Sequence, residues 1–199
     1  MAGAVKQGRI HKVKPAGLKA ARRFSVANGQ LSEVSEAGAV LWQLDLARVT
    51  HARWFNRKLG QSVTRTLTLS DGRATREIRQ HLARRAYLGG PDDMAFRAAV
   101  TDTLRALMAS QSEFEIEDGP PPAMVKAAYG VGLGSLVLGV VLPVWAVIQS
   151  PSLLTIGESA MPGILGVFLG LALVKGYGPN RKITRRAPAE LANELEQTA

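Results

Sequence analysis

The side chains that could do chemistry in this 199-residue chain are mainly arginines, lysines and carboxylates, because it has no cysteine and only three histidines. The lack of cysteine excludes a thiol nucleophile, an iron–sulfur cluster and a cysteine zinc site. Asp45 and His51 could be combined with nearby serines into a catalytic triad, but such triples occur by chance in most sequences of this length. No Walker lysine loop, HExxH or GxSxG motif is present. We therefore expect a non-enzymatic protein with no metal and no cofactor.

Basic side chains form the candidate binding site. An arginine guanidinium presents a fork of N–H donors that matches a phosphate or a carboxylate, so these residues could contact a lipid phosphate or an acidic partner. Arg73 and Arg79 would share one face of a strand, whereas Arg76 should point to the other face unless the register slips. The alternative is a solvated basic surface held near an anionic leaflet. The candidate lipid- or partner-binding residues are Arg48, Arg53, Arg57, Lys58, Arg73, Arg79, Arg84 and Arg85.

The net charge of +9 is concentrated at the amino terminus, where the first 23 residues include seven basic residues and no acidic one. A basic surface favours polyanions, either an anionic membrane or nucleic acid. Nucleic acid is disfavoured, because aromatic residues make up only 6% of the chain and no recognition motif occurs. Residues 1–21 are expected to be a basic arm, with a solvated tail or an organelle transit peptide as alternatives.

Alternating apolar and polar residues predict antiparallel strands in the segment that follows the arm. Asn28-Gly29 is a strong signal for a two-residue hairpin turn, and Asp71-Gly72 predicts a second tight turn. A strand is predicted over residues 63–69, where every second residue is a threonine and most of the residues between are apolar. This pattern is typical of a half-buried sheet.

An amphipathic helix is predicted from Asp92 to about residue 109. Its apolar stripe includes Phe96, Val100 and Leu104, with Arg97 and Arg105 mostly opposite. The following residues, 113–123, begin with four acidic side chains and end in prolines, so we expect an acidic, proline-rich linker.

Two apolar runs, residues 127–148 and 153–174, are each close to the length that a helix needs to cross hydrocarbon. The short turn between them predicts an antiparallel transmembrane hairpin over residues 124–175. A buried hairpin in a soluble core is the weaker alternative, since the rest of the chain is too short and too charged to cover it. Basic residues lie before the first run and after the second, and none lies in the turn between them. The positive-inside rule therefore predicts a multi-pass inner (cytoplasmic) membrane protein with both termini cytoplasmic.

Small residues recur at four-residue spacing in both runs and could let another helix approach closely. The two spans could use these strips on each other, or on another subunit or a second copy. The candidate helix-packing residues are Gly130, Gly134, Ser135, Gly139, Gly166 and Gly170.

Three segments, LWQLDLARVTHARW, SVTRTLTLSDGRATREI and AFRAAVTDTLRAL, follow one another in the order of hairpin strands and a final helix. In this order residues 22–112 resemble a pleckstrin-homology-like (PH-like) domain of the bacterial membrane-associated branch. The resemblance implies an α+β fold in which an antiparallel PH-like sheet or barrel is capped by its C-terminal helix, here followed by the two-helix hairpin. Similar domains commonly bind phosphoinositides or proteins.

These features predict an accessory, assembly or regulatory subunit whose glycine-rich hairpin packs against a larger inner-membrane complex. The expected partners are the lipid bilayer and other membrane-protein subunits or a second copy. The alternative function is a membrane-organising or anionic-lipid-sensing protein that acts alone or as a homo-oligomer. Residues 176–199 are expected to be a cytoplasmic tail, first basic and then acidic.

Overall fold

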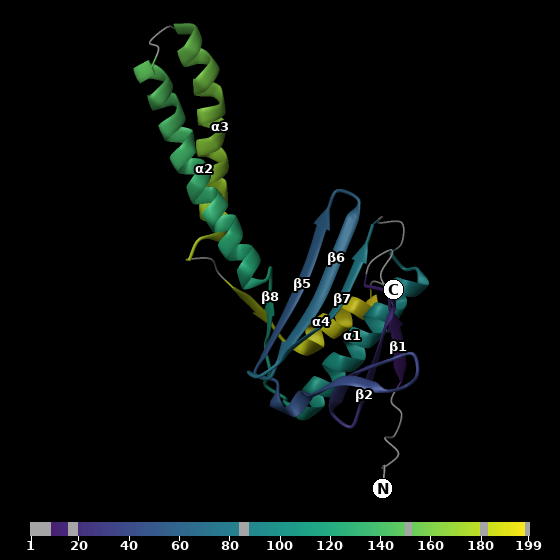
Figure 1. The fold of residues 1–199 in the computed structure, drawn as a ribbon. Helices are drawn as coiled ribbons and strands as arrows, with labels where there is room; N and C mark the ends of the chain where they lie inside the picture. The colour runs from purple at the N-terminus through teal and green to yellow at the C-terminus, as the bar shows by residue number, and fades with distance from the viewer. Residues whose placement is uncertain (1–8, 16–19, 84–87, 150–152, 180–182, 198–199) are drawn as a thin grey trace. The chain divides into compact units, whose positions relative to one another are not determined.

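The computed structural model describes residues 9–15, 20–83, 88–149, 153–179 and 183–197, with the backbone alone over 153–160. The chain divides into two compact units (Figure 1). The first unit consists of residues 1–119 and 183–199, and the second of residues 120–182. The first unit is an α+β domain made from both ends of the chain.

A four-stranded antiparallel sheet opens the first unit, in the order β1-β2-β3-β4. Its strands are β1 (Ile10–Val13), β2 (Arg22–Ala27), β3 (Gln30–Val34) and β4 (Val40–Asp45). The predicted turn at Asn28-Gly29 is confirmed, since Ala27 pairs with Gln30 and both turn residues have positive φ, 51° and 73°. That backbone conformation is the one a two-residue type I′ turn requires.

A five-stranded sheet follows, in the order β7-β6-β5-β8-β9. A short 3₁₀ helix, η1 (Leu46–Arg48), leads into β5 (His51–Leu59), β6 (Ser62–Ser70) and β7 (Thr75–Leu82). The turn predicted at Asp71-Gly72 is present but spans four residues, because Asp71 Oδ1 accepts the backbone N–H groups of Arg73 and Ala74. Strand β8 (Ile116–Asp118) pairs parallel to β5, and β9 (Thr184–Arg186) pairs antiparallel to β8.

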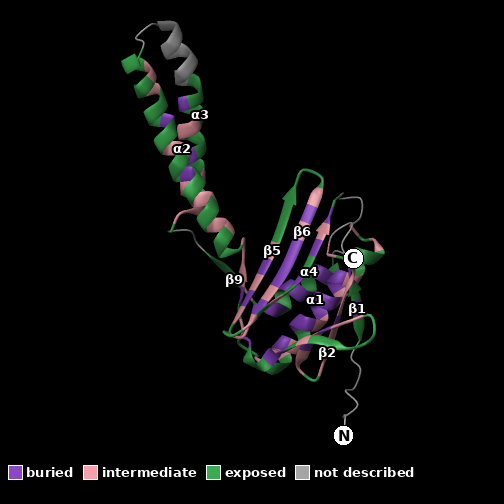
Figure 2. Ribbon diagram, viewed as in Figure 1, coloured by how far each residue is buried: buried purple, intermediate pink, exposed green. Residues whose placement is uncertain are grey.

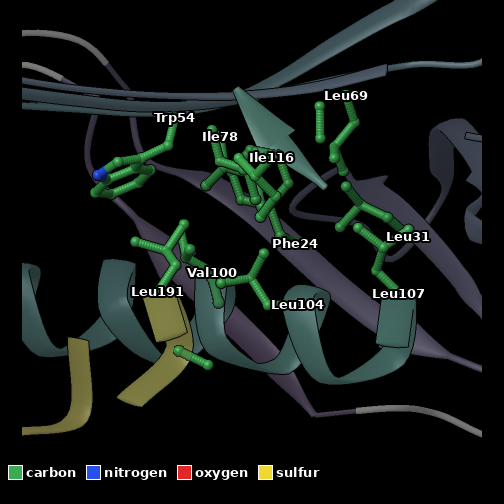
Figure 3. Close-up of a cluster of buried hydrophobic side chains, with 14 of the residues drawn as sticks. Phe24, Leu31, Trp54, Leu69, Ile78, Val100, Leu104, Leu107, Ile116 and Leu191 are labelled. Carbon is green, nitrogen blue, oxygen red and sulfur yellow. The ribbon is translucent and has the colours of Figure 1, made fainter. Parts of the chain in front are cut away.

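Two helices, α1 (Pro91–Ser110) and α4 (Pro188–Gln197), pack against each other and against the strands. One hydrophobic core joins both sheets and both helices, with side chains such as Phe24, Trp54, Leu104 and Leu191 nearly inaccessible to water (Figures 2 and 3). The predicted amphipathic helix is confirmed, with each end within one residue of its expected position. Its expected polar face is only partly solvated, because β1 and α4 contact that helix as well: Arg97 is buried, whereas Arg105 is exposed.

Three predicted segments are partly wrong. Within the basic arm, Ile10–Val13 form β1, where His11 and Val13 are buried and Ile10 and Lys12 are exposed. His11 Nε2 lies 2.8 Å from Asp102 Oδ2, which fixes this strand on α1. The basic arm therefore contains a short strand whose side chains alternate between buried and exposed.

The linker and the tail also belong to the folded unit. Residues 116–118 of the linker form β8, and Ile116 is fully buried. The tail contributes β9 and α4, and Leu191, Ala192 and Leu195 of α4 complete the core. Burying these apolar side chains favours the folded tail over a solvated one.

The second unit contains α2 (Pro122–Gln149) and α3 (Leu153–Tyr177), which pack along each other. Within the described residues, α2 is the helix long and apolar enough to cross a membrane, with a mean hydropathy of 2.3 over its most apolar stretch. Only 11% of that stretch is buried, so α2 does not resemble the core helix of a soluble protein. The described apolar part of α3 is shorter, Met161–Tyr177.

Candidate functional site

The predicted basic residues do not form one cluster. Arg48 in η1 and Arg73 in the β6–β7 turn lie at one end of the five-stranded sheet. The two segments are close together, since the positive charge of Arg48 helps to lower the pKa of Asp71 in the same turn as Arg73. Arg57 and Lys58 lie at the opposite end, on the β5–β6 hairpin. From His51, at the first end, to Arg57 is six residues along β5, or about 20 Å at 3.3 Å per residue. Residues Arg84 and Arg85 lie outside the described part of the chain.

Arg53 is committed to an ion pair. Its Nη2 lies 2.6 Å from Glu117 Oε2, and both side chains are largely buried. His51 Nε2 approaches the same carboxylate at 3.5 Å. Burial raises the pKa of Glu117, but the hydrogen bond from Arg53 and the neighbouring positive charges outweigh it and leave the pKa below its ordinary value. Arg53 therefore serves the packing of β8 on β5 and is not a free phosphate ligand.

Arg76 and Arg79 lie on opposite faces of β7, as the alternation predicts, whereas Arg73 lies in the turn before the strand and not on it. Strand β7 pairs with β6 in unbroken register, so Arg79 lies on the outer face and Arg76 shares the face of Ile78. Arg76 lies 5.1 Å from the centre of the Trp42 ring, a cation–π contact across the domain. No slip in register brings the three side chains together.

A surface pocket of about 310 Å³ lies beside the Arg53–Glu117 pair. It is lined by Thr50, His51, Glu113, Phe114, Glu115, Glu117 and Arg185. Arg185 lies 3.6 Å from Glu115 and 3.9 Å from Glu117, so opposite charges face each other across it. His51 belongs to this pocket, whereas the Asp45 carboxylate accepts the backbone N–H of Ala47, and the two do not form the triad considered above.

The glycines of α2 and α3 fall into two sets. The first set fills the contact between α2 and α3: a methyl group at Gly139 would lie 2.7 Å from the carbonyl oxygen of Gly163, and one at Gly170 would lie 2.7 Å from that of Gly132. Gly166 faces the backbone of Ser135 and Gly139 in the same way. Among the predicted residues, Ser135, Gly139, Gly166 and Gly170 therefore lie at the contact between α2 and α3.

Gly130 and Gly134 form the second set. A methyl group at either would meet no atom within 4 Å among its surroundings. At 100° per residue both lie about 160° around the helix from Gly132, on the face of α2 turned away from α3. Together they make an open GxxxG strip on an apolar helix.

Comparison with protein-family models and with curated proteins gives no match. Within the described residues, no three His, Asp or Glu side chains are placed to hold a metal ion.

A buried carboxylate in the first sheet escaped sequence reasoning. Glu33 accepts two hydrogen bonds from Arg22, at 2.7 and 2.5 Å, and another from Trp42 Nε1. The hydrogen bond from Arg22 holds the pKa of Glu33 below its ordinary value of 4.5, against the effect of burial. Arg22, Glu33 and Trp42 lie on three neighbouring strands, so the strand pairing was the missing signal.

This site predicts a pH dependence of stability. A folded-state pKa below the unfolded value favours the folded protein above pH 4.5, and that contribution is lost as the pH falls through the lower folded pKa. We expect Glu33→Gln to flatten the fall in unfolding free energy between about pH 5 and pH 3, measured by urea denaturation. Glu36→Gln is the control, because Glu36 is 85% exposed. An unchanged acid limb in Glu33→Gln would contradict the assignment.

Proposed function

We propose that this chain is a non-enzymatic protein anchored in the inner (cytoplasmic) membrane by a two-helix transmembrane hairpin, with a PH-like domain and both termini in the cytoplasm. It serves as an accessory, assembly or regulatory subunit, and its hairpin packs against a larger membrane complex. The observation that carries the proposal is the open strip of Gly130 and Gly134 on α2.

The division of the glycines supports a partner beyond the hairpin itself. In lipid, apolar side chains gain nothing by leaving the solvent for each other, so close backbone packing is what holds helices together. Gly132, Gly139 and Gly163 already provide that packing between α2 and α3. Gly130 and Gly134 leave a second flat surface that a further helix could use.

The domain arrangement supports the orientation. Residues 1–119 and 183–199 build one unit, so the segments before and after the hairpin must share one side of any membrane that the hairpin enters. The basic residues that flank the apolar runs favour the cytoplasmic side. Within residues 22–112, strands β2 to β7 precede α1, in the order that the PH-like resemblance implies, while β1, β8, β9 and α4 lie outside that range.

Substitution of the open strip tests the proposal. We expect Gly134→Leu to reduce the fraction of protein in larger species after mild detergent extraction about tenfold, equivalent to about 1.4 kcal/mol. Gly176→Leu is the matched control, because its surroundings are equally open. Native gels and co-purification from membranes provide the measurement. A monodisperse monomer for the unmodified protein in several mild detergents would refute the complex.

The β5–β6 hairpin favours the second candidate function, an anionic-lipid sensor. It places exposed Arg57 and Lys58 beside an exposed leucine. The two functions are compatible, since a subunit of a membrane complex can also read the lipid around it.

A further inference from the structure

We infer that the tip of the β5–β6 hairpin, residues 56–61, docks on the surface of an anionic phospholipid leaflet, with Leu59 entering the interface and Arg57 and Lys58 contacting lipid phosphates. The inference rests on the proposed membrane anchoring and adds to it a specific contact between the domain and the bilayer. It is built from strand direction, side-chain exposure and charge.

Strand direction relates the tip to the points where the chain leaves the domain. Strand β8 runs parallel to β5 and ends at Asp118, opposite Trp54. Beyond Trp54, β5 continues to Leu59, about 16 Å farther in the same direction at 3.3 Å per residue. Because β9 is antiparallel to β8 and begins opposite Asp118, the chain also returns at this end of the sheet. The tip therefore projects from the end of the domain at which both connections to residues 120–182 begin.

The connection into α2 is short. Only Gly119, Pro120 and Pro121 separate β8 from the first residue of α2, and three extended residues span about 10 Å. With α2 in a bilayer, this end of the domain is held close to the headgroups. A tethered surface meets its ligand at high effective concentration, so even a weak contact becomes populated.

The tip has the composition of a membrane contact. Every residue from Asn56 to Gln61 is exposed, and Leu59 is 62% exposed. Alternation along the strand places Arg57 on the same face of the hairpin as Leu59 and Lys58 on the opposite face. No acidic residue occurs between residues 54 and 70, and neither cation forms an ion pair with a described residue.

The hairpin is also built to hold this shape. Leu59 pairs with Ser62, so Gly60 and Gln61 alone form the turn, and Gly60 adopts a φ of 56° that glycine accepts without strain. Ser62 Oγ donates to the Leu59 carbonyl oxygen at 2.9 Å. A preformed turn loses little conformational freedom on docking.

The chemistry at such a contact is additive. An apolar side chain gains by entering the acyl boundary, while long basic side chains keep their charged ends at the phosphates. Each cation near an anionic surface favours binding about fivefold. Arg48 and Arg73, at the opposite end of the sheet, would remain in water.

The test uses the full chain in nanodiscs of phosphatidylcholine, alone or mixed with phosphatidylglycerol. Because the chain has no cysteine, Leu59→Cys gives a single site for an environment-sensitive fluorophore. We expect a blue-shifted emission, quenched by spin-labelled lipid, only with phosphatidylglycerol, and a loss of the effect at high salt. Arg73→Cys at the opposite end should report water in both discs.

Charge removal gives a matched comparison. Adding Arg57→Gln and Lys58→Gln to the Leu59→Cys chain should lower the docked-to-free ratio about thirtyfold, whereas adding Arg48→Gln and Arg73→Gln should leave it unchanged. Equal effects of the two pairs, or a Leu59 probe that stays in water with phosphatidylglycerol, would overturn the inference. The inference would also be overturned if the fluorophore at position 59 were shielded from water in native membranes but not in lipid discs, because that result would indicate a protein partner. Failure of the chain to enter discs at all would instead refute the anchoring.

Discussion

Replacement of Asp93 by asparagine is expected to destabilise the domain by about 3–5 kcal/mol, which is the usual cost of breaking a buried ion pair by removing one partner. Asp93 is completely buried near the start of α1. Its two oxygens accept from Arg65 Nη1 at 2.7 Å and from Arg97 Nη2 at 2.5 Å, and Oδ2 also accepts the backbone N–H of Gly89. One carboxylate thus serves two guanidinium groups on α1 and β6.

The reason for the large effect is the charge that would be left behind. Burial lowers the pKa of the Arg65 guanidinium, but arginine stays protonated in proteins, so both cations would remain inside without their partner. The Nε atoms of Arg65 and Arg97 already lack a hydrogen-bond partner within the described residues.

Urea denaturation of the full chain in detergent would measure this effect, with tryptophan fluorescence as the signal. Trp145 lies in α2, so a Trp145→Phe background leaves only the two domain tryptophans. Arg105→Gln is the control, because its pair with Glu196 is exposed on both sides and surface pairs contribute little. A midpoint for Asp93→Asn equal to that of the control would show that the pair does not stabilise the fold.

The second large effect is expected at the opposite end of the sequence. Leu191 is fully buried in α4, and Leu191→Ala should cost about 2–5 kcal/mol through lost burial and the cavity left behind. A tail that served only as a solvated extension would show no such loss. The same denaturation experiment measures it, and hydrogen exchange in β1 and α1 should rise together with the loss.

Leu41→Ala provides the matched control for Leu191→Ala. Leu41 carries the same side chain but is 61% exposed, so its truncation should change the unfolding free energy by about 0.5 kcal/mol or less. If both variants behave like the unmodified protein, α4 does not contribute to the core.

Local signals in the sequence predicted the elements that depend on local chemistry. Asn28-Gly29 specifies its turn through backbone conformation, and the stripe through Phe96 and Leu104 specifies α1. The carboxyl-terminal helix was missed because its apolar residues, Leu191 and Leu195, are few and lie among acidic side chains. Leu191 and Leu195 stabilise the fold because they complete a core formed mainly by residues 13–116.

The candidate sites were less predictable, because charge partners are set by strand pairing between distant residues. Arg53 was expected to be free until β8 brought Glu117 beside it. For the glycines a signal was available: Gly132 and Gly139 are seven residues apart, the spacing of a helix-packing seam, whereas Gly130 and Gly134 lie off that seam.

The insertion of residues 120–182 between β8 and β9 has a consequence for biosynthesis. Residues 120–182 are synthesised before α4, so the core that contains Leu191 stays incomplete until α2 and α3 have been made. For a chain delivered to a bilayer, maturation of this core requires an even number of crossings, because a single crossing would strand α4 in the wrong compartment. In a chain anchored as we propose, completion of the domain would act as a proofreading step on membrane topology, and misinserted chains would present unfolded segments to cellular proteases.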